Sequence, residues 1–326
     1  MESGQRRLTE AWYRGARWLW VLRPLECLFR GVTALRRQLY RTGVLASYRA
    51  EKPVVIVGNI TVGGSGKTPV VIALVEALDA LGIRAGVVSR GYGASAGQFP
   101  HVVTDLSTSA DCGDEPLLIY RRTACPCVVA PSRTAAVRVL LGQFAVDVVI
   151  SDDGMQHYAL DRDLEIAVLD ADARCGNGFC LPAGPLREPV SRLDSVDFVL
   201  YRGGEGMADS VHYEQLSLVH VRTGEQRPLQ ADSLSPRVYA LAGIGQPGQF
   251  FESLTALGFS LERRIFPDHH AYVARDFTGL DDRPIIMTEK DAVKCGEFAG
   301  DNAWFVKIRA QLPDAVPRAV AALVHS

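Results

Sequence analysis

The 326-residue sequence lacks any C-x-x-C pair among its seven cysteines, any apolar run long enough to cross a membrane, and any excess of basic residues. An odd number of cysteines in a mixed α/β pattern indicates reduced thiols in a cytosolic setting, and neither a disulfide framework nor a zinc site is expected. A membrane span needs about 20 consecutive apolar residues and a secretory signal core about 7–15, so neither is predicted. A formal net charge of −2 disfavours proteins that coat nucleic acid, and we predict no nucleic-acid partner.

Residues 1–50 carry the opposite charge to the rest of the chain. They hold ten Arg and three Glu, a net charge of +7, whereas the remainder holds 25 basic and 34 acidic residues, a net charge of −9. Tryptophan and leucine alternate with the arginines, and Pro24 is expected to divide the segment into helices over roughly 8–22 and 25–40. Such helices either pack on the core with their arginines in water or lie in the headgroup region of an anionic membrane.

Beyond residue 53, short β-branched apolar runs alternate with stretches of helical spacing. Runs of this kind, bounded by Gly or polar residues, are typical of strands buried on both faces of a parallel sheet. The expected strands are 54–57, 84–89, 127–130, 146–150, 164–170 and 196–200, and the expected helices between them are 67–81 and 134–144. The alternation predicts an α/β fold built on a doubly wound, mainly parallel sheet.

The chain is expected to have four parts. These are the amphipathic N-terminal helices over 1–50, which belong to the first domain, a phosphate-loop core over 51–214, a hairpin-like connector over 215–236, and a smaller C-terminal α/β domain over 237–326.

The strongest local pattern is a glycine cluster between the first expected strand and the first expected helix. It ends in Gly66-Lys67-Thr68, the strand–loop–helix setting of a P-loop of the P-loop NTPase type. In such a loop the backbone amides surround phosphate oxygens, Lys67 reaches the β- and γ-phosphates, and the Thr68 hydroxyl ligates Mg²⁺. The common pattern has Gly at position 61, where this chain has Thr61. The expected nucleotide-binding residues are Thr61, Val62, Gly63, Gly64, Ser65, Gly66, Lys67 and Thr68.

A pair of carboxylates follows the apolar run 146–150. Asp152 and Asp153 are thereby placed at the carboxyl end of a strand, where a doubly wound sheet binds its ligand. A Walker-B Asp at this position holds Mg²⁺ directly or through water. We predict Asp152 and Asp153 as metal-site residues, and the spacing leaves open which of them ligates the ion.

Two nucleotide-hydrolysing classes fit the sequence poorly. A GTPase has D-x-x-G after its fourth strand and [NT]-K-x-D for guanine, but here Gly154 directly follows Asp153, and the segment 288–291 (TEKD) has a different order. A partition-type ATPase carries a second lysine ahead of the glycines, where this chain has Val62.

Seven blocks in order carry a more specific signal. They are 57–69 (VGNITVGGSGKTP), 89–93 (SRGYG), 113–116 (GDEP), 152–157 (DDGMQH), 181–189 (LPAGPLREP), 266–270 (FPDHH) and 288–294 (TEKDAVK). In this series the chain resembles the tetraacyldisaccharide 4′-kinase family, the lipid A 4′-kinases of Gram-negative bacteria, over about nine-tenths of its length.

The resemblance implies a function, its cofactors and a location. The implied reaction transfers the γ-phosphate of ATP to the 4′-hydroxyl of a tetraacyldisaccharide 1-phosphate, with ATP and Mg²⁺ as cofactors and this glycolipid as the partner. The implied location is peripheral, at the cytoplasmic face of the inner membrane, with residues 1–50 on an anionic lipid surface; no protein partner is predicted. A partition-type ATPase switch and a kinase for a soluble metabolite are the alternatives.

The resemblance also implies catalytic roles. Asp114 matches the proposed base and His269 its partner, although the adjacent His270 is not excluded by spacing, and Lys67 is the third expected catalytic residue. Five further site candidates, whose alternative role is to order loops, are Glu115, Gln156, His157, Arg187 and Glu188. Arg90 and Tyr92 are candidates for binding the acceptor sugar or its 1-phosphate, with an exposed turn as the alternative, and Arg133 is a candidate for contacting phosphate. Lys290 and Lys294 lie one helical turn apart, the spacing of a solvated helix face.

Overall fold

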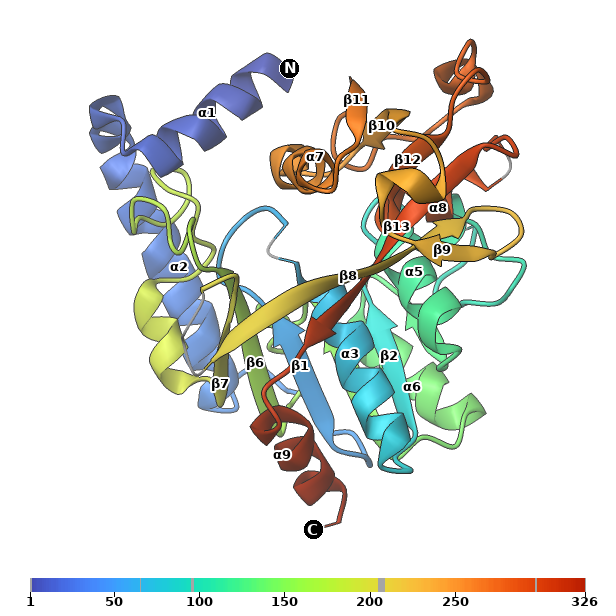
Figure 1. Ribbon diagram of the computed structural model, residues 1–326. Helices are drawn as coiled ribbons and strands as arrows, with labels where there is room; N and C mark the ends of the chain where they lie inside the picture. The colour runs from blue at the N-terminus through green and yellow to red at the C-terminus, as the bar shows by residue number, and fades with distance from the viewer. Residues whose placement is uncertain (1, 65, 95–96, 205–208, 297, 326) are drawn as a thin grey trace.

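The computed structural model describes residues 2–64, 66–94, 97–204, 209–296 and 298–325, and the strands within them form one thirteen-stranded sheet. The predicted α/β class with a mainly parallel sheet is confirmed. Helices cover the N-terminal half of this sheet, and the C-terminal half lies above the carboxyl ends of its strands (Figure 1).

The N-terminal half of the sheet contains seven strands around β1. They are β1 (Val54–Gly58), β2 (Ala85–Ser89), β3 (His101–Val102), β4 (Cys127–Val129), β5 (Val148–Asp152), β6 (Leu164–Asp170) and β7 (Phe198–Arg202). Their spatial order is β7-β6-β1-β5-β2-β4-β3, and every neighbouring pair is parallel except β3 and β4. The five residues of β1 are all buried, because helices or loops cover both of its faces.

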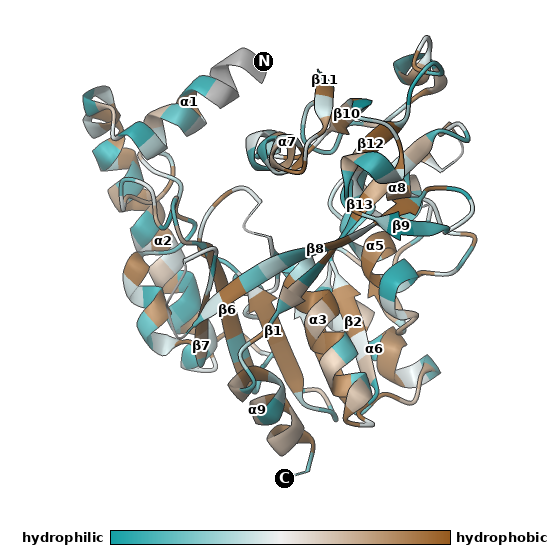
Figure 2. Cartoon of the chain, in the orientation of Figure 1, coloured by the Kyte–Doolittle hydropathy of each residue, from teal (hydrophilic) through white to brown (hydrophobic). Residues whose placement is uncertain are grey.

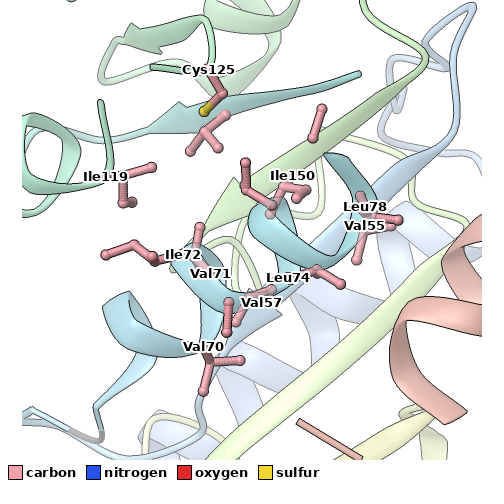
Figure 3. Packing of buried hydrophobic residues seen from close by; sticks show 14 of the residues in the cluster. Val55, Val57, Val70, Val71, Ile72, Leu74, Leu78, Ile119, Cys125 and Ile150 are labelled. Atoms are coloured by element: carbon pink, nitrogen blue, oxygen red, sulfur yellow. The ribbon is translucent and has the colours of Figure 1, made fainter. Parts of the chain in front are cut away.

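Two hydrophobic clusters sandwich these strands. Above one face lie α3 (Lys67–Ala80), α5 (Asp114–Thr123) and α9 (Ala315–Val324), and α6 (Arg133–Gln143) lies on the other. Val70, Leu74 and Leu78 of α3 pack on Val55 and Val57 of β1 in the first cluster (Figure 3). Because α3 follows β1 directly, this packing fixes the loop between them. The short helix α4 (Ser109–Cys112) precedes α5.

Strand β8 (Ser210–His220) joins the two halves of the sheet. It pairs with β7 in parallel through two residues, Ser210 and Val211, and with β13 (Ala303–Gln311) in antiparallel register along nearly its whole length. The short strand β9 (Gln226–Pro228) pairs back on β8. β8 therefore runs across the boundary that we place after residue 214, and the four-part division stays a prediction.

The C-terminal half of the sheet has its own parallel strands and helices. Its elements are β10 (Arg237–Ala242), β11 (Ser260–Ile265), β12 (Ile285–Thr288), α7 (Pro247–Ala256) and α8 (Glu289–Cys295). The strand order is β11-β10-β12-β13, all parallel, and Phe251 of α7 is buried against it. Short 3₁₀ segments occur at η2 (Val190–Ser195), η3 (Ala231–Ser233) and η4 (Ala274–Phe277).

The N-terminal segment is helical, with a break earlier than the one expected at Pro24. Helix α1 (Glu2–Arg14) ends at Gly15, whose φ is +65°, and is followed by the 3₁₀ segment η1 (Arg17–Leu22) and by α2 (Arg23–Arg41). Trp12 anchors the segment by donating from its indole Nε1 to the Pro182 carbonyl at 3.1 Å. Within the described residues, no helix is both long enough and apolar enough to cross a bilayer.

One face of α2 is apolar and exposed to solvent. Leu25, Leu28, Val32 and Leu35 recur at helical spacing and are each at least 55% exposed. The opposite side holds Glu26, which is buried and accepts a hydrogen bond from the Cys180 backbone amide at 3.3 Å. In Figure 2, α2 accordingly alternates between hydrophobic and hydrophilic residues at the edge of the molecule.

Candidate active site

The phosphate loop runs from the end of β1 to the start of α3. Gly66 precedes α3 in the left-handed region, with φ +79°, and a Cβ there would lie 2.6 Å from the Tyr213 hydroxyl oxygen. Tyr213 of β8 donates its hydroxyl hydrogen to the Gly66 carbonyl, so β8 braces the loop. Ser65 lies outside the described residues.

Thr61, the departure from the common P-loop pattern, is structural. Its hydroxyl accepts a hydrogen bond from the Asn59 side-chain amide at 3.1 Å, and the neighbouring Val62 amide donates to the Pro185 carbonyl at 2.8 Å. Thr61 is buried and bridges to Leu186. The first half of the loop is thereby tied to the segment 181–187, whereas Gly63 and Gly64 have open space where a Cβ would stand.

Asp153 forms an ion-pair cluster with two cations. Its carboxylate lies 3.4 Å from Lys67 Nζ and accepts two hydrogen bonds from Arg187, at 3.0 and 3.1 Å. Burial alone raises the pKa of this carboxyl, but Lys67 and Arg187 outweigh it and hold the pKa at about 2. Asp153 therefore stays charged, and its ion pair with Lys67 fixes the position of the Lys67 ammonium beside the phosphate loop.

Asp152 differs sharply from its neighbour. It is fully buried, and neither carboxylate oxygen has a hydrogen-bond partner among the described residues. Burial, with a further contribution from the charge of Glu115, raises its pKa to about 7. An orphaned buried carboxylate is costly unless a cation meets it, so Asp152 fits a ligand of a divalent ion. Mg²⁺ usually keeps waters and phosphate oxygens among its ligands, so one or two protein oxygens are enough to hold it beside a nucleotide. The described residues contain no cluster of three or more His, Cys, Asp or Glu side chains that could hold a metal ion.

Arg133 supports the carboxylate pair from behind. Its guanidinium is buried and donates to the backbone carbonyls of Asp152 at 2.9 Å and Asp153 at 3.3 Å. Burial lowers its pKa to about 10. Arg133 therefore stabilises the backbone conformation at the end of β5, where Asp152 and Asp153 lie.

The structure brings Asp114 and His269 together across 155 residues of sequence. His269 Nδ1 lies 3.1 Å from Asp114 Oδ2, and Asp114 is the first residue of α5. The His269 backbone has φ +58°, a rare conformation for a residue with a side chain, which turns its ring toward α5. His270 instead directs its Nε2 to Asp276 at 2.9 Å and stacks on Phe266.

Of the remaining candidates, Tyr92 and Arg90 are exposed, whereas Gln156, Glu188 and His157 are at least partly buried. Tyr92 is exposed with its ring 5.2 Å from the His269 ring, and Arg90 is exposed close enough to lower the pKa values of Arg133 and His157. Gln156 links the Asn59 carbonyl to Glu188, which is buried beside Arg192. His157 is partly buried, and desolvation lowers its pKa to about 4.

The interpretation of Lys290 and Lys294 as a solvated face is wrong. The Lys294 side chain is 3% exposed, with its Nζ 2.9 Å from Asp291 and 3.8 Å from Asp114. Lys290 Nζ lies 3.3 Å from Glu115. The spacing of two lysines on a seven-residue helix cannot show that α8 packs against α5. The only sequence signal for a site role of these lysines is their position in the block 288–294.

A cavity of about 320 Å³ separates the phosphate loop from the C-terminal half of the sheet. Gly64, Lys67 and Thr68 line one wall, and Glu115 and Lys290 line another. Its size and mixed lining suit a small-molecule ligand. The cavity therefore has room for a ligand whose phosphates contact the phosphate loop.

Replacement of Asp152 by Asn is expected to stabilise the metal-free protein at pH 8. The folded-state pKa of about 7 lies above that of an unfolded aspartate. The free energy of unfolding therefore falls as the pH rises from the pKa of the unfolded aspartate to about 7, and the full loss is present above pH 7. Each pKa unit corresponds to about 1.4 kcal/mol, so Asp152→Asn should raise the free energy of unfolding by roughly 2–4 kcal/mol at pH 8 and leave it unchanged near pH 3.

Urea titrations in EDTA at a series of pH values measure this difference. Asp147→Asn, just before the other end of β5, is the matched control with the opposite sign, because Arg84 lowers the pKa of Asp147 to about 2. A destabilised Asp152→Asn variant at pH 8 would contradict the assignment of Asp152 as an orphaned carboxylate.

Comparison with known proteins shows the family to which this chain is similar. The model of the family described as Tetraacyldisaccharide-1-P 4'-kinase matches residues 18–325. A tetraacyldisaccharide 4'-kinase of Aeromonas hydrophila is 48% identical over 308 residues, which cover 94% of this chain and 92% of that protein. Its counterpart in Azotobacter vinelandii is 49% identical over 314 residues, 95% and 93% of the two chains.

A solved structure agrees with these relatives. The crystal structure of LpxK from Aquifex aeolicus in complex with ATP matches with a TM-score of 0.80 and 29% sequence identity, and the match covers 94% of this chain and 99% of that one.

Proposed function

Because the chain belongs to the tetraacyldisaccharide-1-P 4'-kinase family, we propose that it transfers the γ-phosphate of ATP to the 4′-hydroxyl of a tetraacyldisaccharide 1-phosphate. One observation supports this most directly. The cavity at the phosphate loop is also lined by Glu115, Asp268 and Lys290, the immediate neighbours of the Asp114–His269 pair. The phosphate loop and the immediate neighbours of the Asp114–His269 pair therefore line one space.

The chemical step is an in-line displacement at the γ-phosphorus. The acceptor oxygen forms the new P–O bond, the bond from the γ-phosphorus to the β–γ bridging oxygen breaks, and ADP leaves. Asp114 takes the hydroxyl proton while His269 Nδ1–H holds its other oxygen. Lys67 and the amides of the phosphate loop neutralise the charge that develops on the phosphates.

Thr68 and Asp152 would hold Mg²⁺, with Asp153 fixing Lys67 beside them. When bound, the ion neutralises phosphate charge and orients the β- and γ-oxygens. The orphaned oxygens of Asp152 support this assignment, because an anion buried without a donor calls for a cation.

Incubation with labelled ATP and a tetraacyldisaccharide 1-phosphate in mixed micelles tests the proposal. The expected product is the 4′-phosphorylated glycolipid, formed in step with ADP. Lys67→Met should abolish both products. ATP hydrolysis without a phosphorylated glycolipid would favour an ATPase switch, and phosphorylation of a soluble sugar alone would favour a metabolite kinase.

The proposed location is peripheral, at the cytoplasmic face of the inner membrane, with the N-terminal helices on the lipid surface. A tetraacylated substrate stays in the bilayer, so its kinase must reach the headgroup there. The exposed Leu25–Leu35 face of α2 and the arginines beside it combine apolar burial with attraction to anionic lipid.

Replacing the exposed apolar side chains of this segment is expected to weaken membrane binding. In the variant Trp18→Ser/Leu28→Ser/Leu35→Ser, binding to phosphatidylglycerol-containing vesicles should fall by about tenfold or more, since each large apolar side chain contributes roughly 1.5–3 kcal/mol when fully buried. Vesicle sedimentation measures the loss.

A control triple variant replaces exposed apolar residues elsewhere, Leu81, Leu106 and Ile265, by Ser. It should bind the vesicles like the unmodified protein. Equal losses in the two variants would mean that binding does not depend on residues 1–50.

A further inference from the structure

Helix α8 brings a cation to the free side of the His269 ring. Lys290 lies in the first turn of α8, and its Nζ is 3.5 Å from His269 Nε2, 3.5 Å from Asp268 Oδ1 and 3.3 Å from Glu115 Oε1. The Thr288 side chain caps this turn by accepting from the Asp291 amide, so the position of Lys290 is fixed by the start of the helix.

The two neighbours of the His269 ring require one arrangement of its protons. A neutral imidazole has one N–H donor and one acceptor nitrogen. The Asp114 carboxylate can only accept, so Nδ1 carries the hydrogen, and the Lys290 ammonium can only donate, so Nε2 offers its lone pair. Both contacts are satisfied in the Nδ1–H tautomer and neither is satisfied in the Nε2–H tautomer.

The charge of Lys290 is secured by its acidic surroundings. Burial lowers the pKa of this amine, but Glu115, Asp268 and Asp114 outweigh it and raise the pKa. The Asp268 carboxylate also approaches Nε2, with its Oδ2 at 3.9 Å, and the Lys290 ammonium contacts the other oxygen of that carboxylate. The ammonium thus reaches His269 at a shorter distance than the carboxylate does.

We propose that Lys290 is a positioning residue that holds His269 in the Nδ1–H tautomer and thereby keeps Asp114 available as the base. The part of this proposal that concerns catalysis rests on the proposed kinase function; the tautomer itself does not. In the Nε2–H form the Nδ1 lone pair would face the Asp114 carboxylate. The contact could then survive only with the proton on Asp114, which could no longer accept the proton of the alcohol.

Nitrogen-15 NMR of the histidine side chains tests the tautomer without any substrate. The two-bond couplings distinguish Nδ1–H from Nε2–H, and His269→Gln assigns the signals among the seven histidines. We expect Nδ1–H for His269 in the unmodified protein and in Lys290→Arg, which retains a donor-only cation. In Lys290→Met we expect the doubly protonated ring, because Asp114 still accepts from Nδ1–H and Nε2 then faces the Asp268 carboxylate without the ammonium. An imidazolium beside Asp114 makes that carboxylate a weaker base.

Steady-state kinetics tests whether the protonation state of His269 affects catalysis. Lys290→Met should lower kcat by about tenfold with KM within about twofold, since the loss lies in proton transfer and not in substrate binding. Lys290→Arg should restore most of kcat, and Lys52→Met, at an exposed lysine before β1, should change neither constant.

Retention of the neutral Nδ1–H form in Lys290→Met overturns the proposal whatever the kinetics. Loss of the neutral Nδ1–H form with unchanged kcat overturns the link to Asp114. If no glycolipid is phosphorylated by the unmodified protein, the proposed function fails, while the tautomer measurement still stands.

Discussion

Replacement of Asp114 by Asn is expected to lower kcat by roughly 10²–10⁴-fold, the usual contribution of a general base, with little change in the KM for ATP. The amide has the size of the carboxylate, and its oxygen can still accept from His269 Nδ1–H at the 3.1 Å position. It cannot take up the proton of the acceptor hydroxyl. Initial rates of glycolipid phosphorylation at saturating ATP measure the loss.

His270→Gln is the matched control for this experiment. His270 adjoins His269 in sequence, but its ring contacts Asp276 and Phe266 and not Asp114. Its kcat should stay within about twofold of the unmodified enzyme, since remote polar substitutions leave transition-state contacts intact. A loss in His270→Gln as large as that in Asp114→Asn would contradict the assigned pair.

Replacement of Arg192 by Met is expected to lower the free energy of unfolding by about 3–5 kcal/mol, the usual result of removing one partner of a buried ion pair. Arg192 is 3% exposed and donates to both oxygens of Glu165, at 2.5 and 2.6 Å, and Glu165 is almost as deeply buried. Without the guanidinium, Glu165 still accepts from Arg162 at 2.8 Å, so we expect a loss at the lower end of this range.

Urea unfolding at pH 7.5 measures this loss. Arg318→Met is the control, because the Arg318–Asp314 pair is exposed on both sides and should contribute almost nothing. Since Arg192 also lies 3.7 Å from Glu188, its loss should loosen the Gln156–Glu188 contact next to the phosphate loop. Equal stabilities of the two variants would show that the buried pair does not carry the expected energy.

Six of the seven strands in the N-terminal half of the sheet could be predicted from sequence, because β1, β2, β4, β5 and β6 are buried along their whole lengths. The two-residue, half-buried strand β3 was not predicted. The run 54–57 is apolar throughout and 164–170 is apolar except for Glu165 and Asp170, and the structure has strands at both. Strand β8 had no such signal, since its buried and exposed residues mix along its length. Its role depends on pairing with β13, from Trp304 opposite His220 to Gln311 opposite His212, which are residues far apart in the sequence.

The candidate site could be predicted only in its local parts. The strand–loop–helix pattern is contiguous, so the phosphate loop and the Asp152–Asp153 pair could be located from residues alone. Asp114 and His269 are 155 residues apart, and only the family resemblance joined them. Lys290 was missed because its partners lie on α5 and in the loop before His269, contacts that helical spacing cannot reveal.

The two residues of the proposed acid–base pair lie on opposite sides of β8 in the sequence, which has a consequence for fragments of the chain. Asp114 precedes β8 in the chain and His269 follows it, so a fragment ending at β8 keeps every phosphate-loop residue but lacks the imidazole. Such a fragment could hold a triphosphate without completing the machinery that activates a hydroxyl. The proposed acid–base pair therefore exists only when both halves of the sheet are present and folded together.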